Sequence, residues 1–84
     1  MKNWTSRVSP CRAPFAVTPD DSTNLPRAVR GLYIGTGGDV AVEGVGNDGD
    51  TVVYKNLPDA SYIFIQAVKV LATGTTATDI IGEA

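Results

Sequence analysis

The chain has 84 residues, 43% of them hydrophobic, and a formal net charge of −2. This length accommodates one domain, and a domain so small buries too little surface to be very stable alone. A single cysteine, Cys11, excludes an intrachain disulfide, and the absence of histidine argues against a structural zinc site. We therefore predict no cofactor and expect support from oligomerisation or from docking on a partner.

Membrane insertion and secretion are not expected. No apolar run approaches the ~20 residues that span a bilayer, and the first residues lack the apolar core of a signal peptide. The sequence predicts a protein that is made and assembled in a cytoplasm.

Charge is unevenly distributed along the chain. Residues 1–30 carry five basic and two acidic side chains, whereas residues 31–84 carry two basic and seven acidic ones. The basic residues are dispersed and are not interleaved with aromatic ones, which argues against nucleic acid as the partner. Two interpretations remain, a basic segment that contacts an acidic protein surface or a solvated arm.

Residues 1–26 are predicted to be irregular, because proline removes a backbone donor and interrupts helices and central strands. Within them, Phe15–Val17 is a candidate edge strand, and residues 18–24 have the composition of a turn. We interpret residues 1–14 as an N-terminal arm that a partner orders, and residues 15–84 as a single β domain. The prolines concerned are Pro10, Pro14, Pro19 and Pro26.

From residue 28 the composition becomes that of strands and turns. Ala28–Ile34 predicts a strand, Gly35–Gly38 a tight turn, and Asp39–Val45 the returning strand of a hairpin. Gly46–Gly49 predicts a second hairpin turn, because Asn, Asp and Gly tolerate positive φ. Thr51–Lys55, rich in β-branched residues, predicts the next strand.

The longest apolar run is Tyr62–Ala72, after a predicted turn at Asn56–Ala60. Its many Ile, Val, Phe and Tyr residues and its lack of a 3.6-residue period favour one strand over a helix. A strand that is apolar on both faces is covered on both, here by the core and by another subunit. Thr73–Thr78 predicts a turn and Asp79–Ile81 a last short strand. The pattern predicts an all-β fold, a small antiparallel β-sandwich or barrel with an irregular N-terminal arm.

An enzyme is not expected, and we predict no catalytic residues. Without histidine no Ser-His-Asp or Cys-His arrangement can exist. Asp20 and Asp21 are adjacent in a turn, where carboxylates usually accept hydrogen bonds from backbone amides. Cys11 has Arg12 beside it, which would lower the pKa of its thiol, but neither a base nor an oxyanion site accompanies it.

The glycine- and aspartate-rich turns do not match known phosphate-binding or calcium-binding loops. Gly35–Gly38 precedes a predicted strand, not the helix of a phosphate loop. Asn47–Asp50 lacks the ligand spacing of an EF-hand, so we predict no metal site in one chain, and only an ion shared between subunits stays open. A sugar-stacking surface, and thus a carbohydrate-binding module, is an alternative of another class. Its candidate residues are Trp4, Tyr33, Tyr54 and Tyr62.

Three blocks of sequence follow one another along the chain: Val17–Arg27, Leu32–Val42 and Val70–Ile80. Each block alone is ordinary strand-and-turn sequence, but the three in this order within one short chain are specific. Together they resemble the small spike-base proteins of gene transfer agents and related tailed phages of alphaproteobacteria, over roughly residues 15–82. The N-terminal stretch Lys2–Arg12 and the ending Gly82–Ala84 depart from the family pattern.

The resemblance implies a virion structural protein on the outer surface of a phage-like capsid, most naturally the base of a head spike that anchors a host-binding fibre. The implied partners are further copies of the chain, with a pentamer favoured over a trimer, the major capsid protein and a spike fibre protein. A capsid cement or decoration protein is the alternative among structural proteins. The residues predicted to bind partners are Lys2, Trp4, Arg7, Arg12, Tyr62, Phe64 and Val68.

Overall fold

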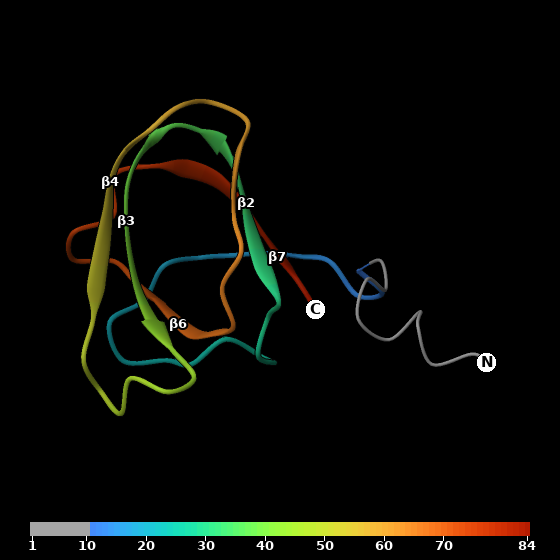
Figure 1. Ribbon diagram of the computed structural model, residues 1–84, viewed down its shortest axis with the longest axis vertical. Helices are drawn as coiled ribbons and strands as arrows, with labels where there is room; N and C mark the ends of the chain where they lie inside the picture. The colour runs from blue at the N-terminus through green and yellow to red at the C-terminus, as the bar shows by residue number, and fades with distance from the viewer. Residues whose placement is uncertain (1–10) are drawn as a thin grey trace.

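The computed structural model describes residues 11–84, which form two antiparallel sheets that face each other (Figure 1). One sheet has four strands in the order β1-β7-β2-β5, and the other has three in the order β4-β3-β6. The predicted all-β fold is therefore confirmed, in its sandwich form. The strands are β1 (Phe15–Ala16), β2 (Gly31–Thr36), β3 (Gly38–Gly44), β4 (Val52–Leu57), β5 (Ser61–Ile63), β6 (Ala67–Leu71) and β7 (Thr78–Glu83).

The core lies between the sheets and follows the two-residue alternation of strands. In β2, Leu32 and Ile34 are fully buried while Tyr33 faces outward, and Val40 and Val42 of β3 meet them from the other sheet. Burial of one such side chain contributes about 1.5–3 kcal/mol, so these strands account for much of the apolar stabilisation. The remaining buried apolar side chains of the cluster are Val17, Val29, Ile63, Ala67, Val70, Ala77 and Ile80.

The hairpin predicted across Gly35–Gly38 is wrong. Strands β2 and β3 are consecutive but do not pair, because β2 lies in the four-stranded sheet and β3 in the three-stranded one. The chain crosses between the sheets at Gly37, where a Cβ would collide with the carbonyl oxygen of Leu57. Gly38 has a φ of 151°. Glycine is needed here because the chain turns a corner between the two sheets. A tight hairpin turn requires the same residue type, so the sequence pattern does not distinguish the two.

The single long strand predicted over Tyr62–Ala72 is also wrong. The run divides into β5 and β6, which lie in different sheets, and residues 64–66 cross between them. Both halves bury side chains, Ile63 in the first and Ala67 and Val70 in the second. The run looks apolar on both faces for two reasons. The chain changes sheet within it, and the pairing of β3 with β6 shifts register between Glu43 and Gly44.

The other predicted strands and turns are found with bounds shifted by up to three residues, so that Asn56 and Leu57 of the predicted turn belong to β4. The turn at Gly46–Gly49 joins β3 to β4 as an antiparallel hairpin, with positive φ at Asp48 and Gly49. Phe15–Ala16 forms the predicted edge strand. The last strand is longer than predicted, Thr78–Glu83, and it is a central strand that pairs with both β1 and β2.

One side of the sandwich is closed by residues 17–29. Backbone amides of Asp20, Leu25 and Val29 donate to carbonyl oxygens of β6 at 2.8–3.1 Å, which covers the edge of the three-stranded sheet. As predicted for this turn, the Asp20 carboxylate accepts from the amides of Ser22 and Thr23. These bonds lower the pKa of Asp20. No described segment covers the opposite side, where β4 and β5 form the edges of the two sheets.

Candidate interaction surfaces

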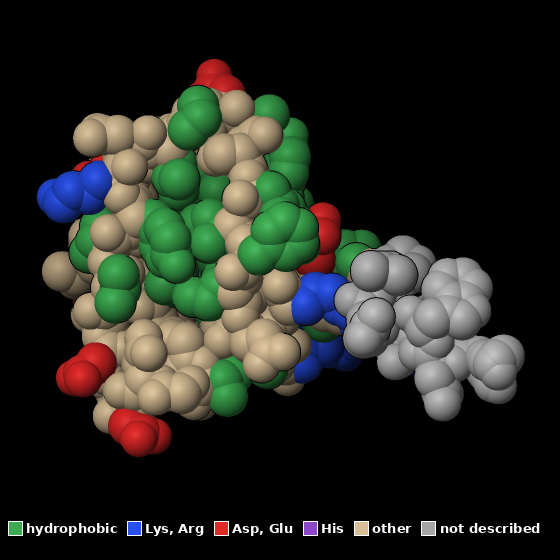
Figure 2. Space-filling view, viewed as in Figure 1, with side chains coloured by type: hydrophobic (Ala, Val, Ile, Leu, Met, Phe, Trp, Pro, Cys, Tyr) green, Lys and Arg blue, Asp and Glu red, His purple; other side chains and the backbone are tan. Residues whose placement is uncertain are grey.

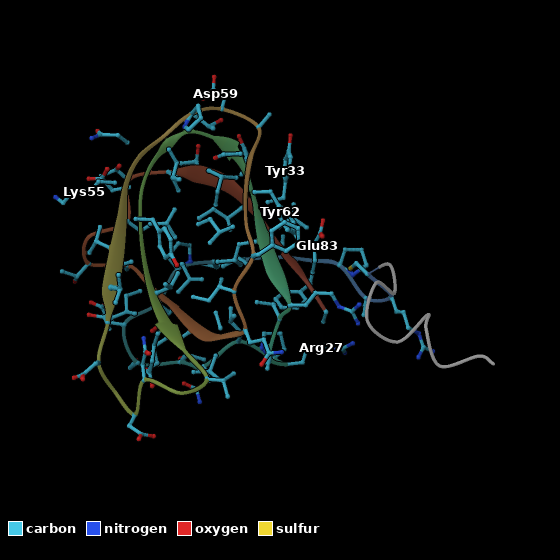
Figure 3. The ribbon with its side chains drawn as sticks, viewed as in Figure 1. Arg27, Tyr33, Lys55, Asp59, Tyr62 and Glu83 are labelled. Atoms are coloured by element: carbon cyan, nitrogen blue, oxygen red, sulfur yellow. The ribbon has the colours of Figure 1, made fainter. Side chains whose placement is uncertain are left out.

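A row of apolar side chains crosses the outer face of the four-stranded sheet. The strand register places Ala16 opposite Ile81, Ile81 opposite Tyr33, and Tyr33 opposite Tyr62. Residues directly opposite each other share a face, so these four form one outer row. Figure 3 shows Tyr33, Tyr62 and Glu83 along this side and Lys55 on the opposite side of the molecule.

The Tyr62 ring lies against Gly31 of β2, which has no side chain. A Cβ on Gly31 would overlap its ring, so the glycine makes room for the tyrosine. Burial raises the pKa of the Tyr62 phenol, and a hydrogen bond to the Glu83 carboxylate raises it further. The phenol is thereby tied to β7, and the aromatic ring forms part of the sheet surface.

Phe64 is the most exposed large apolar side chain of the described residues, at 88%. Its ring packs edge-on against Tyr62, with 4.7 Å between the centroids and 74° between the planes. A phenylalanine held in place by an aromatic neighbour but left open to water is typical of an interface anchor.

The uncovered side of the sandwich is apolar. Val45, Val52, Tyr54 and Ile65 line a hollow of about 360 Å³ that reaches the core residue Val42. Val45 and Val52 are half-exposed, at 51% and 52%. Figure 2 shows hydrophobic side chains filling the middle of this face. We call this surface the apolar opening.

A basic hollow lies beside the four-stranded sheet, where the chain enters it. Arg12, Arg27 and Arg30 line it together with Ala13 and Ala84, around a volume of about 350 Å³. The amides of Arg12 and Ala13 donate to the Ala84 carbonyl oxygen at 2.9 and 3.2 Å. The position of Arg12 is therefore fixed by the backbone, and basic side chains gather there in Figure 2.

The structure places the predicted partner-binding residues in three places. Tyr62 and Phe64 are in contact, and Arg12 lines the basic hollow. Val68 lies in β6 of the other sheet, half-buried, where its carbonyl accepts from Leu25. Lys2, Trp4 and Arg7 lie outside the described residues. Of the proposed sugar-stacking tyrosines, Tyr33 and Tyr62 are neighbours, whereas Tyr54 belongs to the other sheet.

Sequence reasoning missed Arg27, Arg30 and Ile81, and it considered Tyr33 only for sugar stacking. The alternation of Leu32, Tyr33 and Ile34 is a signal that Tyr33 faces outward. No sequence signal indicates that Arg27 and Arg30 meet Arg12, because the three converge only through the fold.

Among residues 11–84, no three or more of His, Cys, Asp and Glu are grouped so that they could hold a metal ion. Within the same range, no helix has the length and hydrophobicity to cross a membrane. Cys11 is a free, partly exposed thiol.

Comparison with solved structures gives one full-length likeness, to a chain of the "Capsid of native GTA particle computed with C5 symmetry". The two chains are 34% identical over 100% of each, with a TM-score of 0.81. No protein-family model and no curated protein matches the sequence significantly. Both the fold and the sequence match over the whole of both chains. The chain therefore belongs to the family of this capsid-associated protein of gene transfer agents.

Proposed function

We propose that the protein is the base of a head spike: a pentamer on the outer surface of a phage-like capsid that anchors a host-binding fibre. The observation that carries the proposal is the full-length likeness to a gene transfer agent capsid chain, which supports a non-enzymatic virion structural protein. The finer assignment rests on the three sequence blocks that resemble spike-base proteins. A pentamer is proposed over a trimer because a closed ring seated on a five-fold vertex matches the symmetry of its site.

The surface of the domain supports an assembly role. Phe64 and the apolar opening expose hydrophobic groups that a small monomer would have no reason to leave in water. A second subunit that covers them also supplies burial that an 84-residue chain cannot provide alone. In this proposal, residues around Tyr62 and Phe64 contribute to contacts between subunits.

The basic arm is proposed to hold the base to an acidic surface of the capsid or of a neighbouring subunit. Arg12 is bonded through its backbone to Ala84, directly after β7. Strand β7 is central in its sheet, so a force applied to the arm is transmitted to the body of the domain. Such an anchor suits a base that carries a fibre.

The number of copies per particle tests the proposal against the cement alternative. Quantitative mass spectrometry of purified particles gives the ratio of this protein to the major capsid protein. Because vertices are few and lattice positions are many, a spike base gives a small ratio. A ratio near one copy per capsid subunit would instead support cement.

A glycan array tests the remaining class. The isolated protein is expected to give no signal, because host binding belongs to the fibre in this proposal. Reproducible binding to one glycan class that Tyr33→Ala and Tyr62→Ala abolish would transfer the assignment to a carbohydrate-binding module.

A further inference from the structure

Most acidic side chains of the protein have a role inside the fold. The carboxylates of Asp20 and Asp39 accept from backbone amides, as do those of Glu43 and Asp59. Asp21 and Asp79 accept from the hydroxyls of Thr73 and Thr36. Glu83 accepts from Tyr62. These interactions account for seven of the nine acidic residues.

The two exceptions are neighbours. Asp48 and Asp50 lie in the turn between β3 and β4, both exposed, and neither carboxylate is bonded to another residue of the described chain. The segment Asn47–Asp50, which we call the acidic hairpin, projects at one end of the molecule. Val45 and Val52, each about half-exposed, flank it. The hairpin therefore presents two carboxylates between two apolar side chains.

The basic hollow has the complementary chemistry. Arg12 and Arg27 are exposed, and within residues 11–84 no carboxylate pairs with either guanidinium. With Arg30 they surround a hollow of about 350 Å³, which is concave where the hairpin is convex. Tyr62 of β5 and Phe64, just after β5, supply apolar surface that the half-exposed valines can meet.

The two surfaces are separate but lie toward the same end of the sandwich, because Val45 at the base of the hairpin lines a hollow with Arg30 and Ala84, which also line the basic hollow. The β3–β4 hairpin is on the side of the three-stranded sheet, and Arg27 lies beside the four-stranded sheet (Figures 1 and 3). In Figure 2 acidic groups project at the lower left, and the largest group of basic side chains lies at the right, beside an acidic group. Within residues 11–84 neither hairpin carboxylate pairs with the guanidinium of Arg12 or Arg27, so both surfaces are left to meet a second copy.

We propose that the acidic hairpin of one copy docks into the basic hollow of the next, so that Asp48 and Asp50 pair with Arg12 and Arg27. Because the two surfaces differ, the contact is head-to-tail, and a head-to-tail contact closes into a ring when its rotation permits. The inference rests on the proposed pentameric base and names the surfaces that form it. The partner is a second copy of this chain.

Charge reversal on one surface, and then on both, tests the contact. The acidic-surface variant is Asp48→Lys with Asp50→Lys, the basic-surface variant is Arg12→Glu with Arg27→Glu, and a third protein combines all four changes. Native mass spectrometry and sedimentation measure assembly of the full chain. Each single-surface variant is expected to weaken assembly about tenfold or more, since paired charges then repel, and the combined variant recovers most of the loss. Lys55→Glu, at an exposed β4 position outside the contact, is the matched control and assembles normally.

Mixing the two single-surface variants gives a result specific to this contact. One variant then carries two basic surfaces and the other two acidic ones, so copies associate only in alternation. Alternating copies close rings of even number and never a ring of five. Even-numbered or open assemblies in the mixture, with each variant alone monomeric, are the expected outcome.

Two results would overturn the inference: single-surface variants that assemble like the wild type, or a folded combined variant that does not recover. If the purified wild type is monomeric, the pair Asp50→Cys and Arg27→Cys in a Cys11→Ser chain is oxidised on particles, and absence of a cross-link between copies counts against the contact. These failures leave the spike-base proposal intact. Wild-type protein absent from vertices would defeat that proposal, whatever the variants do.

Discussion

At the scale of the residue, the aromatic pair Tyr62 and Phe64 is positioned by a glycine. Gly31 leaves the space in which the Tyr62 ring lies, and the ring in turn supports Phe64. The sequence predicted both aromatic residues as partner-binding but assigned them to one continuous strand. Their contact depends on the crossing between sheets that begins at Phe64, and on a register that places Tyr62 near Glu83, neither of which is encoded in local pattern.

The environment of Tyr62 predicts an altered titration. Its pKa lies above the usual 10.0 because burial and the Glu83 carboxylate disfavour the phenolate. Since the folded pKa exceeds the unfolded one, this group's share of the stability is complete below pH 10.0 and is lost as pH rises through the folded pKa. Ultraviolet titration should show the Tyr62 phenol ionising above its usual pH range.

Two variants check that assignment. Tyr62→Phe removes the late transition, and Gly31→Ala returns it to the ordinary range by displacing the ring from the sheet. A late transition that survives in Tyr62→Phe would assign it to another tyrosine.

Substitution of Phe64 should affect assembly without affecting the stability of the monomer. Because the side chain is 88% exposed, Phe64→Ser should change the free energy of unfolding by no more than about 0.5 kcal/mol. The same change should weaken assembly, because it removes an apolar anchor. Phe15→Ser is the contrasting variant, since Phe15 packs against the core and its loss destabilises the monomer. Chemical denaturation and native mass spectrometry measure the two effects, and normal assembly of Phe64→Ser would exclude it from the contact.

At the scale of the element, the sequence located strands and turns better than the connections between them. The hairpin turn at Gly46–Gly49 and the edge strand at Phe15 are confirmed, because turn chemistry and alternation are local properties. The two errors, at Gly35–Gly38 and within Tyr62–Ala72, have the same cause. Alternation reports which side chains are buried, and a strand that changes sheet continues to bury side chains in the same core.

The corner at Gly37 can be tested directly. Gly37→Ala places a methyl group against the Leu57 carbonyl and the Pro58 backbone, which cannot move independently of β4. We expect a loss of about 1–3 kcal/mol in the free energy of unfolding, as for overpacking elsewhere. Gly44→Ala is the matched control, because its Cβ would meet only Asn47 side-chain atoms at 3.6 Å. Thermal or urea unfolding measures both, and equal stability of the two variants would contradict the corner.

At the scale of the whole molecule, the sandwich is asymmetric: one side is closed by residues 17–29, and the other is open and apolar. Composition predicted the need for a partner, since length, one cysteine and no histidine leave little other support. It could not predict where the partner lies. The basic hollow joins residues far apart in sequence, and the acidic hairpin stands out only once the other carboxylates are seen to be bonded.

Removal of residues 1–13 tests the role proposed for the arm. The domain loses the two hydrogen bonds from Arg12 and Ala13 to Ala84, each worth about 0.5–1.5 kcal/mol, while the core remains complete. The shortened protein should therefore fold, as circular dichroism can verify, but attach to particles less completely. Unchanged occupancy on particles would show that the arm does not anchor the base.

The position of the protein on the particle tests the central claim most directly. Particles from a strain that lacks the gene are compared with complemented particles by electron cryomicroscopy, reconstructed without imposed icosahedral symmetry. A spike base predicts that the difference density consists of five-fold rings confined to the outer surface at the vertices. Difference density over the whole lattice would identify a cement protein instead, and difference density inside the shell would contradict the proposed function.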